Sequence, residues 1–378
     1  MTSLVDIGSW ISQNESLLSG LAAMIVVGGV FVSMLGVGLR RLTIGRGGSD
    51  SGSVGGDSAD DSSQTLGIAS KGNTDESESP VPLTFKMLTA PSQYETKFAD
   101  SGGVHIAYNE RGTGPPTIIF APGIISHLTL LENMPVTKGT FACLEEFAHV
   151  IVFDKRGQGL SDPTVSAPSL EERTDDIEAV MNDAGVDRAI LFGVSEGGPM
   201  CLNFAYLHPD RIQGVVLVGT TARWVQSEDF PIGLPRRVLE SLPSRWGRGV
   251  LRDLFFPSIT RQQMDDDTYK AFESLIAPRS AIQQLVEMMI ETDIRPILPD
   301  IRVPTLVVHF TGDLAVPIRL GRFVADHLPN AEFLEVNGVD HADVSQSPEA
   351  VERIREFCER VAAEDQHRST DHEPIGPG

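Results

Sequence analysis

Cysteine and basic side chains are scarce in this 378-residue sequence, and each shortage excludes a class of protein. The three cysteines, Cys143, Cys201 and Cys358, lie far apart among apolar neighbours. We therefore expect all three in the core, and neither a disulfide framework nor a metal site. Lysine and arginine total 30 against 52 acidic residues, a formal net charge of −22. That balance argues against a nucleic-acid partner, because phosphate binding needs a basic surface.

Charge of either sign is absent from the mostly apolar residues 16–39. At about 1.5 Å per residue, a helix of this length crosses a hydrocarbon core of roughly 30 Å. A cleaved signal peptide fits less well, because Asp6 and Glu15 precede the run and Arg40-Arg41 follows it. We predict that residues 1–46 form a single-pass membrane anchor. The positive charge after the span places the rest of the chain on the cytoplasmic side.

Apolar side chains are sparse in two further segments. Residues 47–80 are rich in glycine, serine and acidic residues, and we expect a disordered, extended linker there. Residues 363–378 are predicted to be a disordered tail. One globular domain, residues 81–362, remains between them.

Short apolar runs alternate with helical patterns through this domain. Ser169 with Glu172 is typical of a capping box, and Ser347 is placed to cap the last helix. No convincing strand occurs in 221–304, which we interpret as an inserted helical cap. The pattern predicts a mostly parallel sheet covered by helices on both faces. The strands are expected as a hairpin (94–98 and 104–108) and then at 116–121, 149–154, 189–192, 215–218, 305–308 and 332–336.

One motif in the domain can carry chemistry by itself. Gly193-Val-Ser195-Glu-Gly197 joins a buried strand to a helical stretch, which would place Ser195 on a strained turn with its hydroxyl exposed. Gly193 and Gly197 would prevent side-chain collisions where strand and helix approach. An ordinary turn of small residues is the alternative, and the motif alone does not decide between them.

Three further motifs accompany this one in a fixed order. They are Phe-Asp-Lys-Arg-Gly-Gln-Gly-Leu-Ser-Asp at 153–162, Val-Pro-Thr-Leu-Val-Val-His with Thr-Gly-Asp at 303–313, and Asp-His at 340–341. Together the four motifs resemble the serine-nucleophile α/β-hydrolase superfamily over roughly residues 94–362. The stretches at 153–157 and 193–200 are similar to those of hydrolase domains that accompany adenylate cyclase or helix-turn-helix modules in actinobacteria, although neither module is visible here.

The resemblance implies a triad in the chain order serine, acid, histidine. Ser195 is then the nucleophile, and His341 the base that takes its proton. Asp313 is the expected acid, which holds the imidazole in the right tautomer. Asp340 and Asp343 are the alternatives for the acid, because they lie close to His341 in sequence.

The resemblance also implies two backbone N–H donors for an oxyanion, from Glu196 and Ile124. The chain has Ala-Pro-Gly at 121–123 where many members have His-Gly, so the identity of the second amide stays open. A structural turn network without a catalytic role is expected of Asp154, Arg156 and Asp162.

The predicted activity is hydrolysis of an ester-type bond in a largely apolar small molecule, with no metal or organic cofactor. A serine nucleophile argues against epoxide and haloalkane hydrolysis, whereas cleavage of carbon–carbon bonds, thioesters, amides or lactones shares the triad. The rival is a non-catalytic, membrane-anchored ligand sensor, against which the intact triad argues. Substrate contacts are expected from Ile125, His127, Trp224 and Met288, with Leu254, Phe255, Phe256 and Met289 as further apolar candidates in the cap.

Overall fold

The computed structural model describes residues 82–370. The predicted membrane anchor (1–46) and acidic linker (47–80) lie outside the described residues and stay predictions. Within residues 82–370, no helix is both long and apolar enough to cross a bilayer.

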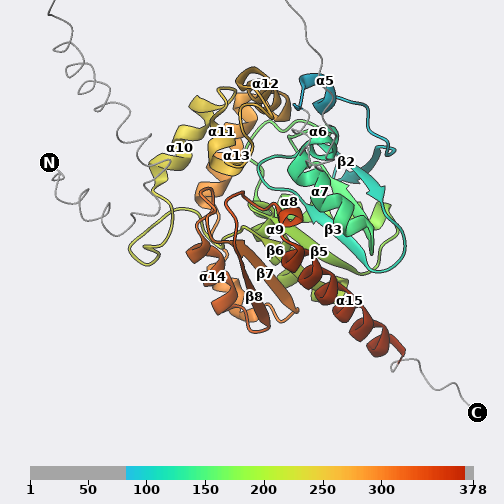
Figure 1. Ribbon diagram of the computed structural model, residues 1–378. Helices are drawn as coiled ribbons and strands as arrows, with labels where there is room; N and C mark the ends of the chain where they lie inside the picture. Colours follow the sequence, from blue (N-terminus) through green and yellow to red (C-terminus); the bar gives the residue numbers. More distant parts are fainter. Residues whose placement is uncertain (1–81, 371–378) are drawn as a thin grey trace, which may run out of the picture. The chain divides into compact units, whose positions relative to one another are not determined.

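Eight strands form one sheet in the order β1-β2-β4-β3-β5-β6-β7-β8 (Figure 1). Strand β2 runs antiparallel to both of its neighbours, and every other adjacent pair is parallel. The expected mostly parallel sheet and its opening hairpin are confirmed. The strands are β1 (Lys97–Ser101), β2 (Val104–Arg111), β3 (Thr117–Ala121), β4 (His149–Phe153), β5 (Ala189–Val194), β6 (Ile212–Val218), β7 (Thr305–Phe310) and β8 (Ala331–Val336).

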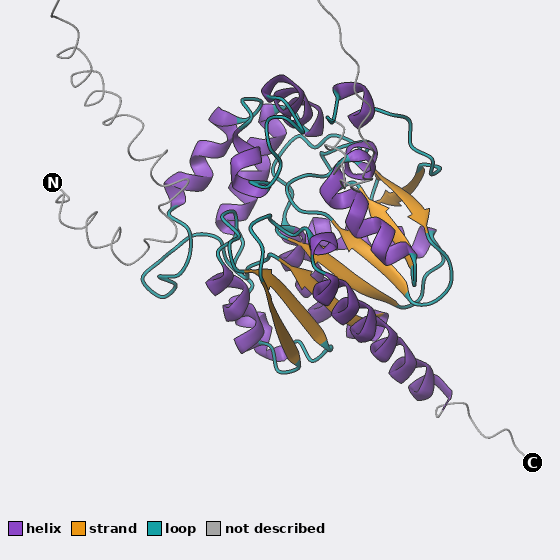
Figure 2. Ribbon diagram, in the orientation of Figure 1, coloured by secondary structure: helices purple, strands orange, loops and turns teal. Residues whose placement is uncertain are grey.

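Helices cover both faces of the sheet (Figure 2), which explains why the strand sequences are apolar without alternation. Successive strand residues enter different cores: Ile119 and Leu191 pack on one face, and Ile118 and Ile190 on the other. The first face is covered by α8 (Leu170–Asp183), α9 (Gly197–Leu207) and α14 (Ile318–His327). The second is covered by α6 (Leu128–Asn133), α7 (Pro135–Glu145) and α15 (Pro348–Thr370). Shorter elements are α5 (Phe85–Leu88), η3 (Pro209–Arg211) and η5 (Val344–Gln346).

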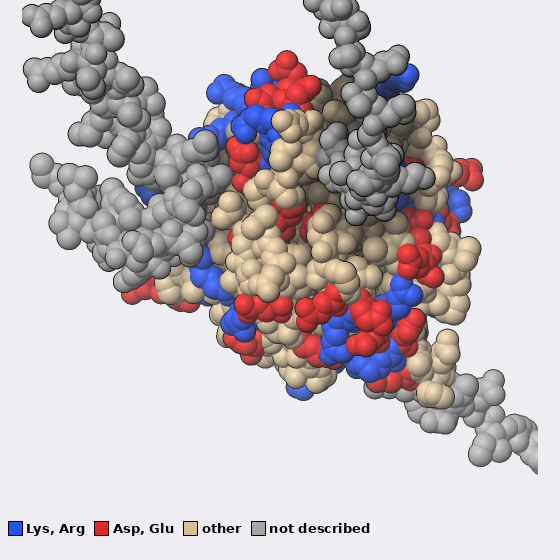
Figure 3. All heavy atoms as spheres, in the orientation of Figure 1, with Lys and Arg blue, Asp and Glu red and all other residues tan. Residues whose placement is uncertain are grey.

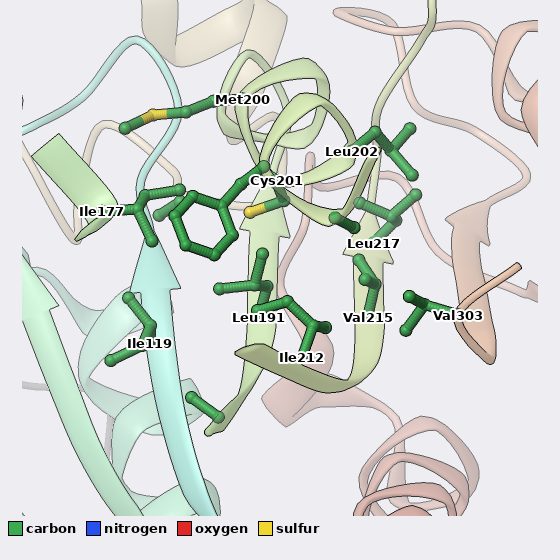
Figure 4. Close-up of a cluster of buried hydrophobic side chains, with 14 of the residues drawn as sticks. Ile119, Ile177, Leu191, Met200, Cys201, Leu202, Ile212, Val215, Leu217 and Val303 are labelled. Atoms are coloured by element: carbon green, nitrogen blue, oxygen red, sulfur yellow. The ribbon is translucent and has the colours of Figure 1, made fainter. Parts of the chain in front are cut away.

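Helix α9 is the central element of the first core. Figure 4 shows Met200 and Cys201 on its side of that core, with Leu191 of β5 and Val215 of β6 opposite them. The expected core position is confirmed for Cys201 here and for Cys358 in the second core, but is wrong for Cys143, which is half-buried; all three are free thiols. Tight packing of α9 on the sheet fixes the position of its first residue, which follows Ser195 and Glu196.

The interval between β6 and β7 contains helices and, apart from isolated bridges, no strand among its described residues. Figure 1 shows these helices as one yellow-to-orange group, with α10 packed along α13. We call residues 221–304 the cap. Its elements are α10 (Arg236–Arg245), α11 (Val250–Phe255), α12 (Asp266–Ile276), α13 (Arg279–Glu291) and η4 (Arg295–Asp300).

The expected disordered tail from residue 363 is wrong for residues 363–370, because α15 continues to Thr370. Asp365 explains part of the extension: it forms an ion pair with Arg188 at 2.7 Å and accepts a hydrogen bond from Gln213 at 3.0 Å. Residues 371–378 lie outside the described part. The helix begins as expected, with the Ser347 hydroxyl accepting from the backbone N–H of Ala350.

Acidic and basic side chains are intermixed on the face drawn in Figure 3, over the region where Figure 1 labels α15. Arg353 and Arg360 of this helix both pair with Glu332, and Arg355 pairs with Glu146. Exposed pairs of this kind contribute about 0–1 kcal/mol each. Attachment of α15 therefore depends mainly on the apolar side chains that it buries.

Candidate active site

Ser195 occupies the tight turn between β5 and α9. Its φ is +52°, in the left-handed region that costs a non-glycine residue on the order of 1–3 kcal/mol. Two neighbours hold this conformation: the Ser195 N–H donates to Val218 O at 2.8 Å, and the Thr220 hydroxyl donates to Ser195 O at 2.6 Å. The strained turn predicted from the Gly-x-Ser-x-Gly motif is thus present.

The two flanking glycines are required by different neighbours. A Cβ on Gly193 would lie 2.9 Å from Cys201 Sγ in α9, as expected for a close approach of strand and helix. A Cβ on Gly197 would instead lie 2.3 Å from Ala121 O, at the end of β3. The second glycine therefore serves contact with the adjacent loop.

Asp313 is the carboxylate that meets His341. Its Oδ2 lies 2.7 Å from His341 Nδ1, and its Oδ1 accepts from the backbone N–H groups of Ala315 and Val316, both at 2.9 Å. The two alternative acids are engaged elsewhere. Asp340 accepts from Ser258 in the cap, and Asp343 accepts from the Ser345 hydroxyl.

His341 is fixed by the cap as well as by Asp313. Its backbone N–H donates to Phe255 O at 2.7 Å, and the two rings meet edge to face at 5.1 Å between centroids. Its buried Nε2 has no hydrogen-bond partner among residues 82–370. The ring is therefore oriented through Nδ1, which leaves Nε2 free to accept a proton.

Ser195 and His341 line the same cavity, which has an empty volume of about 520 Å³ including its open mouth. Apart from these two residues, its walls are apolar side chains, two threonines and the main chain of the loop after β3. The other lining residues are Phe120, Pro122, Gly123, Ile124, Ile125, Leu131, Val136, Thr137, Thr140, Val194, Phe255, Phe256 and Ala342.

Most of the expected substrate contacts lie outside this cavity. Ile125 lines it, whereas His127 precedes α6 and its Nδ1 is buried without a partner among the described residues. Trp224 is buried in the cap, and Met288 packs its sulfur 3.4 Å from Arg173. The apolar cap residues that close the cavity are Phe255 and Phe256.

The loop after β3 lies directly against Ser195. A Cβ on Gly123 would lie 2.9 Å from Ser195 Cβ, so only glycine fits without a shift. Ile124, the next residue, lines the cavity, and Glu196 is the first residue after Ser195 and the N-cap of α9. Both residues expected to donate backbone N–H groups therefore flank the serine.

This arrangement agrees with comparisons to known proteins. The family model for the alpha/beta hydrolase fold matches residues 116–263. BpoC of Mycobacterium tuberculosis, named as a candidate non-heme bromoperoxidase, is 25% identical over 258 residues, covering 66% of this chain and 95% of its own. A pimeloyl-[acyl-carrier protein] methyl ester esterase of Neisseria meningitidis is 26% identical over 210 residues, covering 54% and 81%. A solved thermophilic esterase from Thermogutta terrifontis is 25% identical with a TM-score of 0.57, covering 72% of this chain and 100% of its own.

The chain has the α/β-hydrolase fold. Its relatives include hydrolases of several kinds, which supports hydrolase activity in general. Among residues 82–370, no three histidine, cysteine, aspartate or glutamate side chains are grouped as ligands for a metal ion.

The turn network expected from the sequence after β4 is present. Arg156 binds Asp176 of α8 through two nitrogens, at 2.6 and 3.0 Å, and Asp162 pairs with His105 at 2.8 Å. Burial raises the pKa of Asp154 to about 7, and its carboxylate accepts from the backbone N–H of Leu160 at 2.8 Å. None of these side chains lines the cavity.

A second histidine, which was not predicted from the sequence, lies beside the acid. His309 is fully buried, with its Nε2 3.7 Å from Asp313 Oδ2 and 2.7 Å from Val316 O, to which it donates. Burial lowers the pKa of His309, although the neighbouring Asp313 opposes this shift. Its position in strand β7, four residues before Asp313, was the available signal.

A buried charge cluster was not predicted either; we call Lys155, Arg173 and Glu196 the charge triad. Lys155 and Arg173 both pair with the Glu196 carboxylate, and all three side chains are at most 2% exposed. Burial opposes ionisation of Glu196, but the charges of Arg173 and Lys155 outweigh it and lower its pKa to about 2. Burial lowers the pKa of Lys155 to about 8. The available signal for this cluster was the presence of Lys155 in the motif at 153–162 and of Glu196 in the motif at 193–198.

Proposed function

We propose that this protein is a serine hydrolase that cleaves ester-type bonds through a covalent acyl-enzyme on Ser195. The observation that carries the proposal is the His341–Asp313 pair. Its 2.7 Å contact orients a buried imidazole whose Nε2 lacks a partner among residues 82–370, in the cavity that also contains Ser195.

In the proposed first step, Ser195 Oγ attacks the carbonyl carbon while His341 Nε2 takes the hydroxyl proton. The carbonyl oxygen becomes an oxyanion, which accepts hydrogen bonds from the N–H groups of Glu196 and Ile124. Asp313 stabilises the imidazolium without taking its proton. The tetrahedral intermediate then collapses, the alkoxide leaves with the proton from His341, and the acyl group stays on Ser195.

In the second step water replaces the alcohol. His341 Nε2 takes a proton from water, the resulting hydroxide adds to the acyl carbon, and the same N–H groups hold the oxyanion. Collapse breaks the bond to Ser195 Oγ, which recovers its proton from His341. The products are a carboxylic acid and the alcohol, and the enzyme is unchanged.

The cavity walls favour an uncharged, apolar substrate. Of the lining residues, His341 alone has a titratable side chain. The Thr140 hydroxyl donates to Val136 O at 3.1 Å and the Thr137 hydroxyl to Leu131 O, so their hydrogens are engaged within α6 and α7. A charged acyl group would lose its hydration here without gaining a partner.

A fluorophosphonate probe tests the reaction. We expect the folded protein to take up the probe on the peptide that contains Ser195, and Ser195→Ala to take up none. A folded wild-type protein that is not labelled, and hydrolyses no ester, would refute the proposal and favour the ligand-sensor alternative.

A series of p-nitrophenyl esters tests the substrate class. We expect kcat/KM to rise from acetate to medium-length acyl chains. A succinate half-ester should react at least tenfold more slowly than the butyrate ester of the same chain length, because its carboxylate must be desolvated. Preference for the charged ester would contradict the argument from the cavity walls.

A further inference from the structure

The charge triad lies where three loops meet at one edge of the sheet. Because β3 lies between β4 and β5, the loops that follow these strands are neighbours. The loop after β3 carries Gly123, the loop after β4 carries Lys155, and the turn after β5 carries Glu196. The same edge holds Ser195, so the triad lies next to the proposed oxyanion site.

Lys155 connects the two segments that flank Ser195. Its ammonium donates to Gly123 O at 2.5 Å and also to the Glu196 carboxylate. Among the described residues, no other side chain forms hydrogen bonds to both the loop after β3 and Glu196. One cation thus fixes the loop after β3 relative to the start of α9.

The bond to Gly123 O has a consequence for the next amide. Gly123 O and the Ile124 N–H belong to one peptide group, and in a trans peptide they point in opposite directions. Anchoring the oxygen on Lys155 therefore directs the Ile124 N–H away from the triad. A hydrogen bond to the carbonyl also polarises the peptide group, which strengthens its N–H as a donor.

Other contacts from the loop after β4 support the same orientation. Gln158 Nε2 donates to Ile124 O at 3.1 Å, and the Lys155 backbone N–H donates to the Ser126 hydroxyl at 3.0 Å. Gly123, Ile124 and Ser126 are therefore all held from a single loop, the one that carries the Asp-Lys-Arg-Gly-Gln stretch.

A contribution to stability alone is a weak explanation for the charge triad. Burying three charges carries a desolvation cost that pairing rarely more than offsets, and apolar residues of similar volume often serve as well. Arg173 also contacts Met200 and Met288, so its surroundings are partly apolar. The triad carries two positive charges and one negative, which leaves a net positive charge beside the N-terminus of α9.

We propose that Lys155 is a positioning residue that holds the Ile124 amide toward the oxyanion, with Glu196 and Arg173 as the partners that keep its ammonium in place. The inference rests on the proposed function and extends it to residues that do not touch the substrate. Lys155 acts through the Gly123–Ile124 peptide.

Lys155→Met tests this role, because it removes the donor but leaves Glu196 paired with Arg173. We expect kcat/KM for p-nitrophenyl butyrate to fall about 100-fold, the usual effect of losing one oxyanion donor, with KM little changed. Octylthio-trifluoroacetone forms an oxyanion when the serine hydroxyl adds to its ketone carbonyl, so its binding should weaken by a similar factor. Binding of octylthio-acetone, which stays a ketone, should not change.

Two further variants separate positioning from folding. The triple change Lys155→Met, Arg173→Met and Glu196→Met removes every charge of the triad and retains the Glu196 backbone N–H. We expect it to fold with loss of trifluoro-ketone affinity. The control, Arg156→Met with Asp176→Asn, removes a buried pair that joins the same loop to α8 and should leave that affinity unchanged.

The outcomes are distinct. Unchanged trifluoro-ketone affinity in folded Lys155→Met or in the folded triple variant overturns the positioning role while the proposed function stands. Failure of both variants to fold, judged by circular dichroism, assigns the triad to stability and also overturns it. A wild-type protein without ester turnover or phosphonate labelling refutes the proposed function itself, and the positioning role with it.

Discussion

Gly123→Ala isolates the close approach between the loop after β3 and Ser195. The added Cβ would lie 2.9 Å from Ser195 Cβ and 3.2 Å from Val194 O. Carbon atoms in van der Waals contact lie about 3.5–4.0 Å apart, so the loop must retreat by roughly 0.6–1 Å. Gly123 is not among the residues with positive φ, so alanine adds no backbone strain of that kind.

The expected loss follows from the geometry of oxyanion donors. Such donors act at about 2.7–3.1 Å, and a retreat of this size carries the Ile124 N–H out of that range. We expect kcat to fall about 100-fold or more, as for removal of one donor. Overpacking should lower the free energy of unfolding by about 1–3 kcal/mol, which leaves the protein folded.

Ester turnover and thermal unfolding are measured together, with Gly102→Ala as the matched control. Gly102 lies in the β1–β2 turn at φ +64°, and an added Cβ there has no atom within 4 Å. This control should lose about 1–2 kcal/mol through backbone strain and keep its kcat. Wild-type kcat in Gly123→Ala, with the unfolding shift present, would refute the placement of the loop.

Further predictions concern the histidine, the cavity, pH and the N-terminal segment. Gly219→Ala should lower kcat at least tenfold, because the added Cβ would lie 2.9 Å from His341 Cε1 and residue 219 has a φ of +58°. Wild-type NMR chemical shifts for the His341 ring in this variant would contradict the prediction. Phe256→Ala should shift the ester preference to longer chains, whereas Ala at exposed Phe98 should not. The pKa of Glu196 is lowered to about 2, so the unfolded state binds more protons between pH 4.5 and 2. Stability should therefore fall through that window by about 3 kcal/mol more in wild type than in the triple Met variant, as denaturant titrations can measure. Residues 16–39 should retain the full chain in membranes washed with alkaline carbonate, and release by that wash would argue against an anchor.

The sheet was predictable because its strands are buried on both faces. The runs at 116–121, 149–154 and 305–308 have no polar alternation, which is typical of parallel strands under helices. The capping box of Ser169 and Glu172 marked the start of α8 correctly. Helix α6, with six residues, is too short to show a helical period. The last turns of α15 were missed because their stabilising partner, Arg188, is remote in sequence.

Site residues that belong to a sequence motif were predictable, whereas site residues whose position depends on packing between distant elements were not. Chain order separates Asp313 from Asp340 only by analogy, whereas the 2.7 Å contact with His341 distinguishes them directly. Neither Trp224 nor Met288 lines the cavity that contains Ser195, because the direction of a cap side chain depends on helix packing, and their contact with substrate stays a prediction. The link between Lys155 and Glu196 spans forty-one residues and follows only from the strand order β4-β3-β5.

The most direct test of the central claim is mass analysis of the protein during turnover of p-nitrophenyl butyrate, quenched in acid. We predict a butyryl group on the peptide that contains Ser195, formed together with a burst of p-nitrophenol and absent from Ser195→Ala. Steady turnover without an adduct, or an adduct on another residue, would contradict it.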